Sequence, residues 1–114
     1  MSWGHAVSRD LLHWEQKDDV LFPDETGTMF SGSGIVNDRK MLGLPEDAVI
    51  IFYTAAGNNN KWSAGKQFTQ RIAYSTDLLK WEQTDGVRHA AYINKMAYAA
   101  QTYSNTGNLC MTVQ

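Results

Sequence analysis

The chain has 114 residues, of which 43% are hydrophobic and 19% are charged, and its formal net charge at pH 7 is −2. These values are typical of one globular domain or a piece of one, and they argue against a disordered chain. The 10 basic and 12 acidic side chains leave no excess of positive charge, so nucleic acid is not expected as a partner.

The first residues and the apolar runs of the chain indicate where in the cell the protein is expected. The longest apolar run, Ala48 to Ala56, has about half the length that spans a bilayer, so no membrane partner is expected. The first ten residues lack the charged-then-apolar layout of a signal peptide, which slightly favours the cytoplasm. Cys110 is the only cysteine, so no internal disulfide is expected and the compartment stays open.

Strand signals dominate the chain. Phe30 to Val36 (FSGSGIV) is extended but carries two glycines, which in a strand indicate a bulge or a close approach. Val49 to Thr54 (VIIFYT) is β-branched and aromatic, which predicts a buried strand. Gln70 to Ser75 (QRIAYS) alternates, which predicts a strand with Ile72 and Tyr74 on one face.

Turn-rich stretches separate these strands, at Pro23 to Thr28, Asn37 to Lys40, and Gly57 to Gly65. His89 to Gln101 is rich in alanine and is compatible with a helix, so its structure is ambiguous. The sequence therefore predicts an all-β chain, with that one segment unassigned.

The sequence contains an internal repeat. His5 to Asp18 (HAVSRDLLHWEQKD) and Ile72 to Asp85 (IAYSTDLLKWEQTD) agree at nine of fourteen positions and lie 67 residues apart. Two copies separated by several strands are typical of radially repeated sheets such as propeller blades. Nothing in the repeat is a nucleophile or a set of metal ligands, so we expect it to be a structural device.

The repeated S-x-D-L-L-x-W pattern predicts a tight turn. Ser8 with Asp10, and Ser75 with Asp77, have short polar side chains that can bond nearby loop amides and hold a hairpin turn. The Trp is expected to lay its ring back over the strands, while the two Leu residues fill the space beneath. A short helical turn with Ser as its N-cap is the alternative, and the two are not exclusive.

No catalytic or metal site follows from spacing. The histidines and Cys110 lack the spacing of zinc ligands, and S-G-S-G is neither a hydrolase elbow nor a phosphate loop, so no cofactor is expected. Two carboxylates that act on a glycosidic bond must face each other across it. The adjacent acidic pairs are instead expected to be solvated charge among turn residues: Asp18-Asp19, Asp24-Glu25 and Glu46-Asp47.

The order of the motifs carries a resemblance. W-G-H-A-x-S-x-D-L-x-H-W, at Trp3 to Trp14, resembles the first-blade segment of glycoside hydrolase family 32, which contains invertases, inulinases and levanases. Later stretches keep the family's order over roughly residues 3 to 85: Leu21 to Ser33 (L-x-P-D-E-x-G-x-M-F-S-G-S), Ile51 to Ala55 (I-F-Y-T-A) and Gln70 to Asp77 (Q-x-I-A-Y-S-T-D). The resemblance implies a five-bladed β-propeller with four antiparallel strands per blade. In the family, β-fructofuranosyl ends are cleaved with retention in the central funnel.

Few residues of the family's site match. Phe30 and Ser31 match the F-S pair that lines the fructose-binding subsite, where Ser31 would hydrogen-bond sugar hydroxyls and Phe30 would shape the pocket. The alternative is that Phe30 is a core residue and Ser31 merely part of a strand. The family's nucleophile motif N-D-P-N-G, its R-D-P motif and its E-C acid/base motif do not occur in the chain, so no catalytic residue is predicted.

The last part of the chain has a different resemblance. Tyr98 to Asn105 (YAAQTYSN) resembles a later family segment, D-F-Y-A-x-Q-x-F, although Met96 and Ala97 stand where that segment has Asp and Phe. We therefore expect residues 1–85 to form the first-blades portion, 86–95 an unrecognised junction and 96–114 a piece of a later segment. The expected fold is a partial propeller, open because it is truncated or internally deleted, which predicts self-association through unpaired sheet edges.

The resemblance implies a function. The chain is expected to be a fragment of a retaining glycoside hydrolase that cleaves β-fructofuranosyl bonds in sucrose or fructans, with a fructose-terminated saccharide as its partner. It is expected to be inactive alone. A non-catalytic carbohydrate-binding propeller module is one alternative, and a structural or partner-binding β-protein that merely shares the hairpin device is another.

Overall fold

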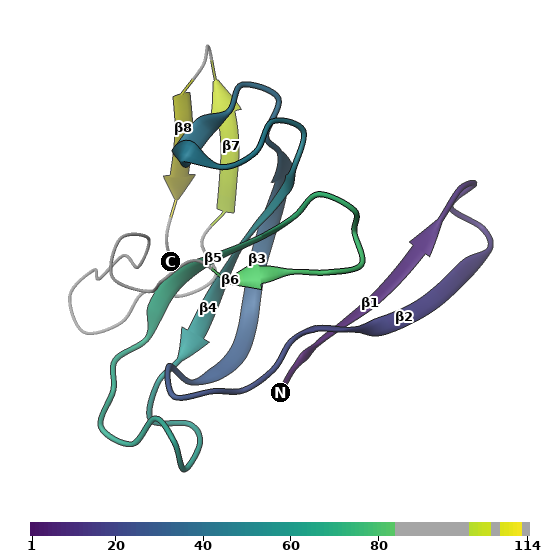
Figure 1. The fold of residues 1–114 in the computed structure, drawn as a ribbon. Coiled ribbons are helices and arrows are strands. Elements are labelled where there is room, and N and C mark those ends of the chain that lie inside the picture. Colours follow the sequence, from purple (N-terminus) through teal and green to yellow (C-terminus); the bar gives the residue numbers. More distant parts are fainter. Residues whose placement is uncertain (84–100, 106–107, 113–114) are drawn as a thin grey trace.

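A computed structural model of the chain describes residues 1–83, 101–105 and 108–112, and these residues form β-strands joined by turns (Figure 1). The strands are β1 (Trp3–Ser8), β2 (Trp14–Leu21), β3 (Thr28–Val36), β4 (Val49–Ala56), β5 (Thr69–Ser75), β6 (Glu82–Gln83), β7 (Gln101–Asn105) and β8 (Asn108–Thr112), with one 3-10 turn, η1 (Met41–Gly43). Among these residues no helix is long and apolar enough to cross a membrane. The predicted all-β class is confirmed.

Each strand pairs with its neighbour in the sequence, and every pairing is antiparallel. β1 and β2 form a hairpin, β3 to β6 form a four-stranded sheet in chain order, and β7 and β8 form a second hairpin. β7 lies beside β3. A four-stranded antiparallel sheet in chain order has the architecture of a single propeller blade.

The three predicted strands are confirmed, because the predicted ranges lie within β3, β4 and β5. Along β5, Ile72 is opposite Phe52, whereas Ala73 is opposite Ile51, so alternate residues do lie on opposite faces of the sheet. The ambiguous segment from His89 lies outside the described residues, except that Gln101 begins β7.

The sheet has an apolar cluster on each face. One face carries Ile51, Tyr53 and Ala73, and the hairpin covers it with Leu21 and Trp3. The other face carries a second cluster, made of Ile50, Phe52 and Ile72 with Ile35, Leu44 and Tyr74 packed against it. A strand buried on both faces needs apolar residues at every position, which explains the uninterrupted VIIFY run of β4.

The base of the β1–β2 hairpin is anchored to the sheet, and its tip projects away (Figure 1). Trp3 meets Tyr53 edge to face, with ring centroids 6.3 Å apart, and His5 meets Trp81 in the same way at 6.1 Å. Such aromatic pairs contribute about 0.5–1.5 kcal/mol each beyond the burial of their area. The hairpin is therefore held by the odd-numbered residues of β1.

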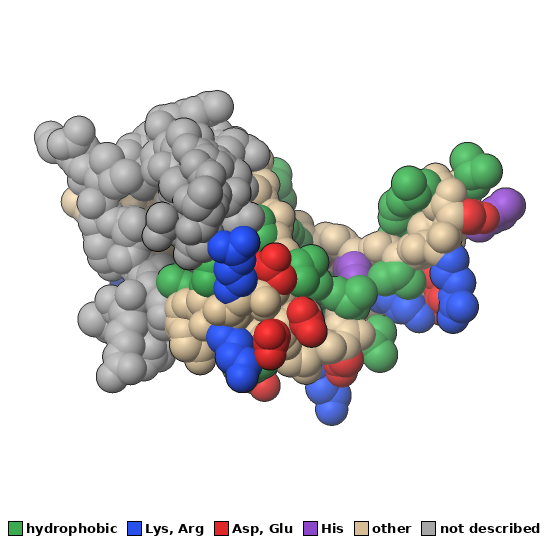
Figure 2. Space-filling view, turned by 90° about the horizontal axis from the view of Figure 1, so that it is seen from above, with side chains coloured by type: hydrophobic (Ala, Val, Ile, Leu, Met, Phe, Trp, Pro, Cys, Tyr) green, Lys and Arg blue, Asp and Glu red, His purple; other side chains and the backbone are tan. Residues whose placement is uncertain are grey.

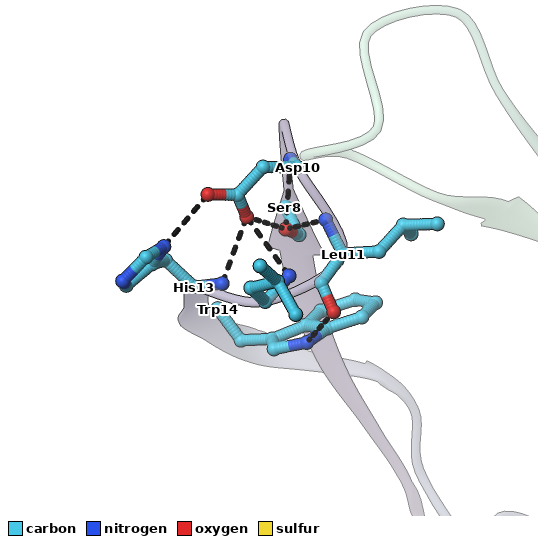
Figure 3. A network of polar contacts seen from close by, with 6 residues as sticks. Ser8, Asp10, Leu11, His13 and Trp14 are labelled. Atoms are coloured by element: carbon cyan, nitrogen blue, oxygen red, sulfur yellow. Dashed lines mark hydrogen bonds and ion pairs between the residues drawn. The ribbon is translucent and has the colours of Figure 1, made fainter.

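The first repeated turn is held by side chains that bond backbone amides (Figure 3). Ser8 Oγ accepts the N–H groups of Asp10 and Leu11, at 3.2 and 2.8 Å. Asp10 Oδ1 accepts those of Leu12 and His13, at 2.9 and 2.8 Å. These four bonds stabilise Leu11 in the left-handed region, with φ of 64°, which is unfavourable for a branched side chain.

The second copy repeats the four side-chain-to-backbone hydrogen bonds of this turn. Ser75 Oγ accepts the N–H groups of Asp77 and Leu78. Asp77 Oδ1 accepts those of Leu79 and Lys80. Leu78 also has φ of 64°. The strand pairing agrees as well, since the pair of Ala6 with Gln16 becomes Ala73 with Gln83 after the same shift of 67 residues. The predicted hairpin turn is confirmed.

The predicted packing of the leucines is wrong. Leu11 and Leu12 are 76% and 80% exposed, and Leu78 and Leu79 are exposed as well. The leucines therefore lie at the surface of the turn instead of filling the space beneath it. Trp14 lies along the turn, where its Nε1 donates to the carbonyl of Leu11 at 3.2 Å (Figure 3).

Candidate saccharide-binding site

The predicted site residue Ser31 lies at a β-bulge. The pairing of β3 with β4 shifts between Phe30 and Gly32, so Ser31 is the extra residue, and it is exposed. A Cβ added to Gly32 would lie 1.8 Å from the carbonyl oxygen of Phe52, so this position needs glycine. The predicted bulge and close approach are confirmed there. Bulges re-aim side chains, and they are frequent beside active sites.

Phe30 is fixed from two sides. Its ring, which is half-buried, meets Phe68 edge to face at 6.0 Å and an interplanar angle of 89°. Its carbonyl oxygen accepts the indole N–H of Trp3 at 2.8 Å. The ring is thus positioned by the loop before β5, and the backbone beside Ser31 is positioned by β1.

Two polar residues beside Phe30 were missed in the sequence analysis. Thr54 is opposite Phe30 on β4, and Gln70 is opposite Thr54 on β5. Both side chains are buried, and Gln70 Nε2 donates to Thr54 Oγ1 at 2.8 Å. Thr54 is the first polar residue after the apolar run of β4, and a polar residue inside a predicted buried strand is the signal that could have identified it.

Phe30, Thr54 and Gln70 therefore form a row across three strands, with Ser31 next to it. An aromatic ring flanked by hydroxyl and amide groups provides the apolar surface and the hydrogen-bond partners that a sugar requires. Thr54 and Gln70 are 0% and 2% exposed, whereas Ser31 is exposed and Phe30 is half-buried. The row contains no carboxylate, so it cannot by itself supply a nucleophile or a proton.

The acidic pairs are structural or solvated. Asp18 and Asp19 were predicted to lie among turn residues, and this is wrong, because both lie within β2. Asp19 accepts a hydrogen bond from the hydroxyl of Ser2 at 2.7 Å. Asp24 Oδ1 accepts the amide of Thr26 at 2.8 Å. Across the described residues no group of three His, Cys, Asp or Glu side chains could hold a metal ion.

Two tyrosines have raised pKa values. Burial raises the pKa of Tyr53, an effect that the positive charge of Arg71 partly offsets. Tyr74 donates to Glu82 Oε2 at 2.7 Å, and this hydrogen bond raises its pKa. Both phenols therefore stay protonated at neutral pH, and they act as donors or packing groups in the sheet.

The family of the chain follows from comparison with known proteins. Residues 1–108 match the glycosyl hydrolases family 32 N-terminal domain. The chain belongs to this family. The resemblance read from the W-G-H-A and F-S-G-S motifs is thus confirmed.

Several curated relatives are similar to the chain. Levanase from Bacillus subtilis is 40% identical over 80 residues, which cover 68% of this chain and 11% of that protein. Fructan beta-fructosidase from Streptococcus mutans is 34% identical over 91 residues, covering 76% and 6%. Invertase from Schizosaccharomyces pombe is 38% identical over 86 residues, covering 66% and 14%. The chain thus spans only a small part of the length of these relatives.

The fold has a counterpart among solved structures. A family 32 β-fructofuranosidase from Bombyx mori superposes with a TM-score of 0.75 at 20% identity, covering 99% of this chain and 23% of that one. The predicted fold, a partial propeller of antiparallel sheets, is confirmed. The predicted division at residues 86–95 stays a prediction, and most of the residues it concerns lie outside the described part.

Proposed function

We propose that the chain is part of a retaining glycoside hydrolase of family 32 that cleaves β-fructofuranosyl bonds in sucrose or fructans. Within that enzyme, Phe30 and Ser31 contribute to the pocket that binds the terminal fructosyl group. The observation that carries this assignment is the bulge, which exposes Ser31 beside an anchored aromatic ring. The named activities of the relatives, levanase, fructan β-fructosidase and invertase, support the same substrate class.

The proposed roles are those of binding residues. The hydroxyl of Ser31 donates to, or accepts from, hydroxyls of the sugar, and the ring of Phe30 packs against the apolar face of its carbons. In the retaining reaction one carboxylate attacks the sugar and a second protonates the leaving oxygen. The motifs that carry those two carboxylates in the family do not occur in this chain. The isolated chain therefore binds saccharide without hydrolysing it.

A binding experiment on the 114-residue protein tests the pocket. Saturation-transfer NMR with sucrose and short inulin oligomers is expected to show contact with the fructosyl protons. Ser31→Ala is expected to weaken binding about tenfold, because it removes one or two hydrogen bonds to the sugar. Ser33→Ala, two residues further along β3 and past the bulge, is the matched control. Equal effects of both variants, or binding that survives Phe30→Ala unchanged, would contradict the assignment.

A chimaera tests the catalytic context. The stretch of Bacillus subtilis levanase that aligns with this chain is replaced by the corresponding residues of the chain, and hydrolysis of levan is measured. The chimaera is expected to hydrolyse levan, and Ser31→Ala within it is expected to lower kcat/KM about tenfold. A chimaera whose circular dichroism matches that of the levanase but which is inactive would overturn the proposed function.

A further inference from the structure

A hydrogen bond beside the candidate site joins the β1–β2 hairpin to the sheet. The indole N–H of Trp3, on β1, donates to the carbonyl oxygen of Phe30, on β3, at 2.8 Å and across 27 positions of the chain. The ring of Trp3 is itself fixed, because it meets Tyr53 edge to face and packs against the apolar cluster that contains Met29. The donor therefore comes from a different sheet, on a ring that packing holds in place.

That carbonyl oxygen belongs to the peptide group that links Phe30 to Ser31. A peptide group is planar, so a bond that holds the carbonyl oxygen of Phe30 also fixes where the amide nitrogen of Ser31 lies. At a bulge the hydrogen-bond ladder is locally disrupted, and Ser31 is the residue that has no counterpart on β4. A donor from outside the sheet can therefore set the direction of the Ser31 side chain at the point where β4 constrains it least.

Neighbouring contacts make this bond part of a short row. The carbonyl oxygen of Met1 accepts the backbone N–H of Met29 and the hydroxyl of Thr28, both at 3.0 Å. The first residues of the chain thus run beside the start of β3, and the indole bond joins the row at Phe30, immediately before the exposed Ser31. Figure 2 shows the hairpin projecting from the body of the molecule, so the contacts at its base fix its orientation.

Two other tryptophans show what the N–H of Trp3 adds. Trp81 packs against the same apolar cluster, yet its buried Nε1 has no hydrogen-bond partner within the described residues. The Nε1 of Trp14 donates within its own turn, to the carbonyl oxygen of Leu11. Packing against this cluster therefore does not require a bonded indole N–H, whereas the N–H of Trp3 reaches the peptide group beside Ser31.

We propose that Trp3 is a positioning residue for the saccharide site. Its N–H holds the peptide group between Phe30 and Ser31 in the orientation that presents the Ser31 hydroxyl to the sugar. Trp3 acts through Ser31 and makes no contact with the sugar itself. The inference rests on the proposed function, in which Ser31 binds the fructosyl group. It couples the docking of the hairpin on the sheet to the affinity for saccharide.

Trp3→Phe tests the role of the N–H, because it keeps an aromatic ring against Tyr53 and removes the donor. We expect it to weaken the binding of sucrose to the 114-residue protein about fivefold, since Ser31 is no longer held toward the sugar. Trp81→Phe is the matched control, because it makes the same change of ring against the same cluster but removes an N–H that has no partner in the described part of the chain. It is expected to leave the affinity unchanged. Far-UV circular dichroism shows whether each variant is folded.

A double-mutant cycle separates positioning from packing. If Trp3 acts through the Ser31 hydroxyl, Trp3→Phe should weaken binding about fivefold in the wild-type protein and not at all in Ser31→Ala. The wild-type protein gives a second measurement, which decides if Trp3→Phe does not fold. In a proton–nitrogen correlation spectrum, saturating sucrose should shift the indole N–H resonance of Trp3 and leave that of Trp81 in place.

Three results would overturn the positioning role alone. The first is an equal effect of Trp3→Phe and Trp81→Phe on sucrose affinity, which would assign the effect to the ring. The second is an effect of Trp3→Phe that is as large in Ser31→Ala as in the wild-type protein. The third is an indole resonance of Trp3 that does not respond to saturating sucrose. In each case the proposed function stands if Ser31→Ala still weakens binding, whereas an affinity that Ser31→Ala leaves unchanged overturns both proposals.

Discussion

At the scale of single residues, the two repeated turns differ at His13, where the second copy has Lys80. The pKa of Asp10 is held far below its usual value of 3.8, first by the backbone N–H of His13 and then by its side chain, whose Nδ1 lies 2.6 Å from Asp10 Oδ2. Backbone bonds from Lys80 and Leu79 lower the pKa of Asp77. The two turns therefore show what the imidazole of His13 adds, because Asp77 has the same backbone bonds without a histidine.

His13→Lys makes the first turn match the second. We expect the pKa of Asp10 to rise toward that of Asp77 and to stay below 3.8, because the backbone bonds remain and the imidazole bond is lost. An NMR titration of the side-chain carboxyl carbons measures both values in one sample. If the pKa of Asp10 does not move, the imidazole has no part in the turn.

The same two carboxylates predict how stability depends on pH. Both pKa values are lower in the folded chain than the ordinary 3.8, so the stabilisation is complete above that pH and is lost as the pH falls through the folded values. We expect the urea concentration at the unfolding midpoint to decrease as the pH is lowered below 3.8. The decrease should be smaller in a double variant with Asp10→Asn and Asp77→Asn. The asparagine oxygen still accepts the amide bonds but has no proton to gain. Equal slopes in the two proteins would contradict this assignment.

At the scale of elements, the bulge in β3 depends on one glycine. Gly32→Ala would place a Cβ 1.8 Å from the carbonyl oxygen of Phe52, so β3 and β4 must separate. We expect it to destabilise the fold by about 3 kcal/mol, at the upper end of what overpacking costs. Gly34→Ala is the matched control, since its Cβ meets ordinary contacts at 3.5 Å, and it should change stability by less than about 1 kcal/mol. Urea denaturation measures the free energy of unfolding of both variants. Equal losses of stability in the two would contradict the role of Gly32 in the bulge.

The strands could be predicted from the sequence because their signals are local. Val49 to Thr54 is β-branched and aromatic, and the two Ser–Asp pairs bond amides within three residues of themselves, so neighbouring residues carry the information. The bulge was also indicated, by glycines inside a strand. The outward leucines were missed, because the left-handed conformation of Leu11 and Leu78 has no marker in a branched side chain.

The candidate site was harder to predict than the strands. Phe30 and Ser31 came from the resemblance, whereas the contacts that position them join residues far apart in the chain. Trp3 reaches Phe30 across 27 positions, and Gln70 reaches Thr54 across 16. Such contacts depend on strand register, which no pattern within a single strand determines.

At the scale of the whole molecule, the layers predict an order of local stability. β4 is the centre of the described structure, since it pairs on both edges and is buried on both faces, so its amides open only when the sheet itself unfolds. The β1–β2 hairpin has neither property. It contacts the sheet through one face, and its tip residues Leu11 and Leu12 are largely exposed.

Hydrogen exchange followed by mass spectrometry at low protein concentration measures this order. We expect the amides of β4 and β5 to exchange last and those of β1 and β2 to exchange much sooner, with the hairpin opening while the sheet stays closed. If hairpin and sheet exchange together at low concentration, they unfold as one unit, and the hairpin is as firmly held as the blade it covers.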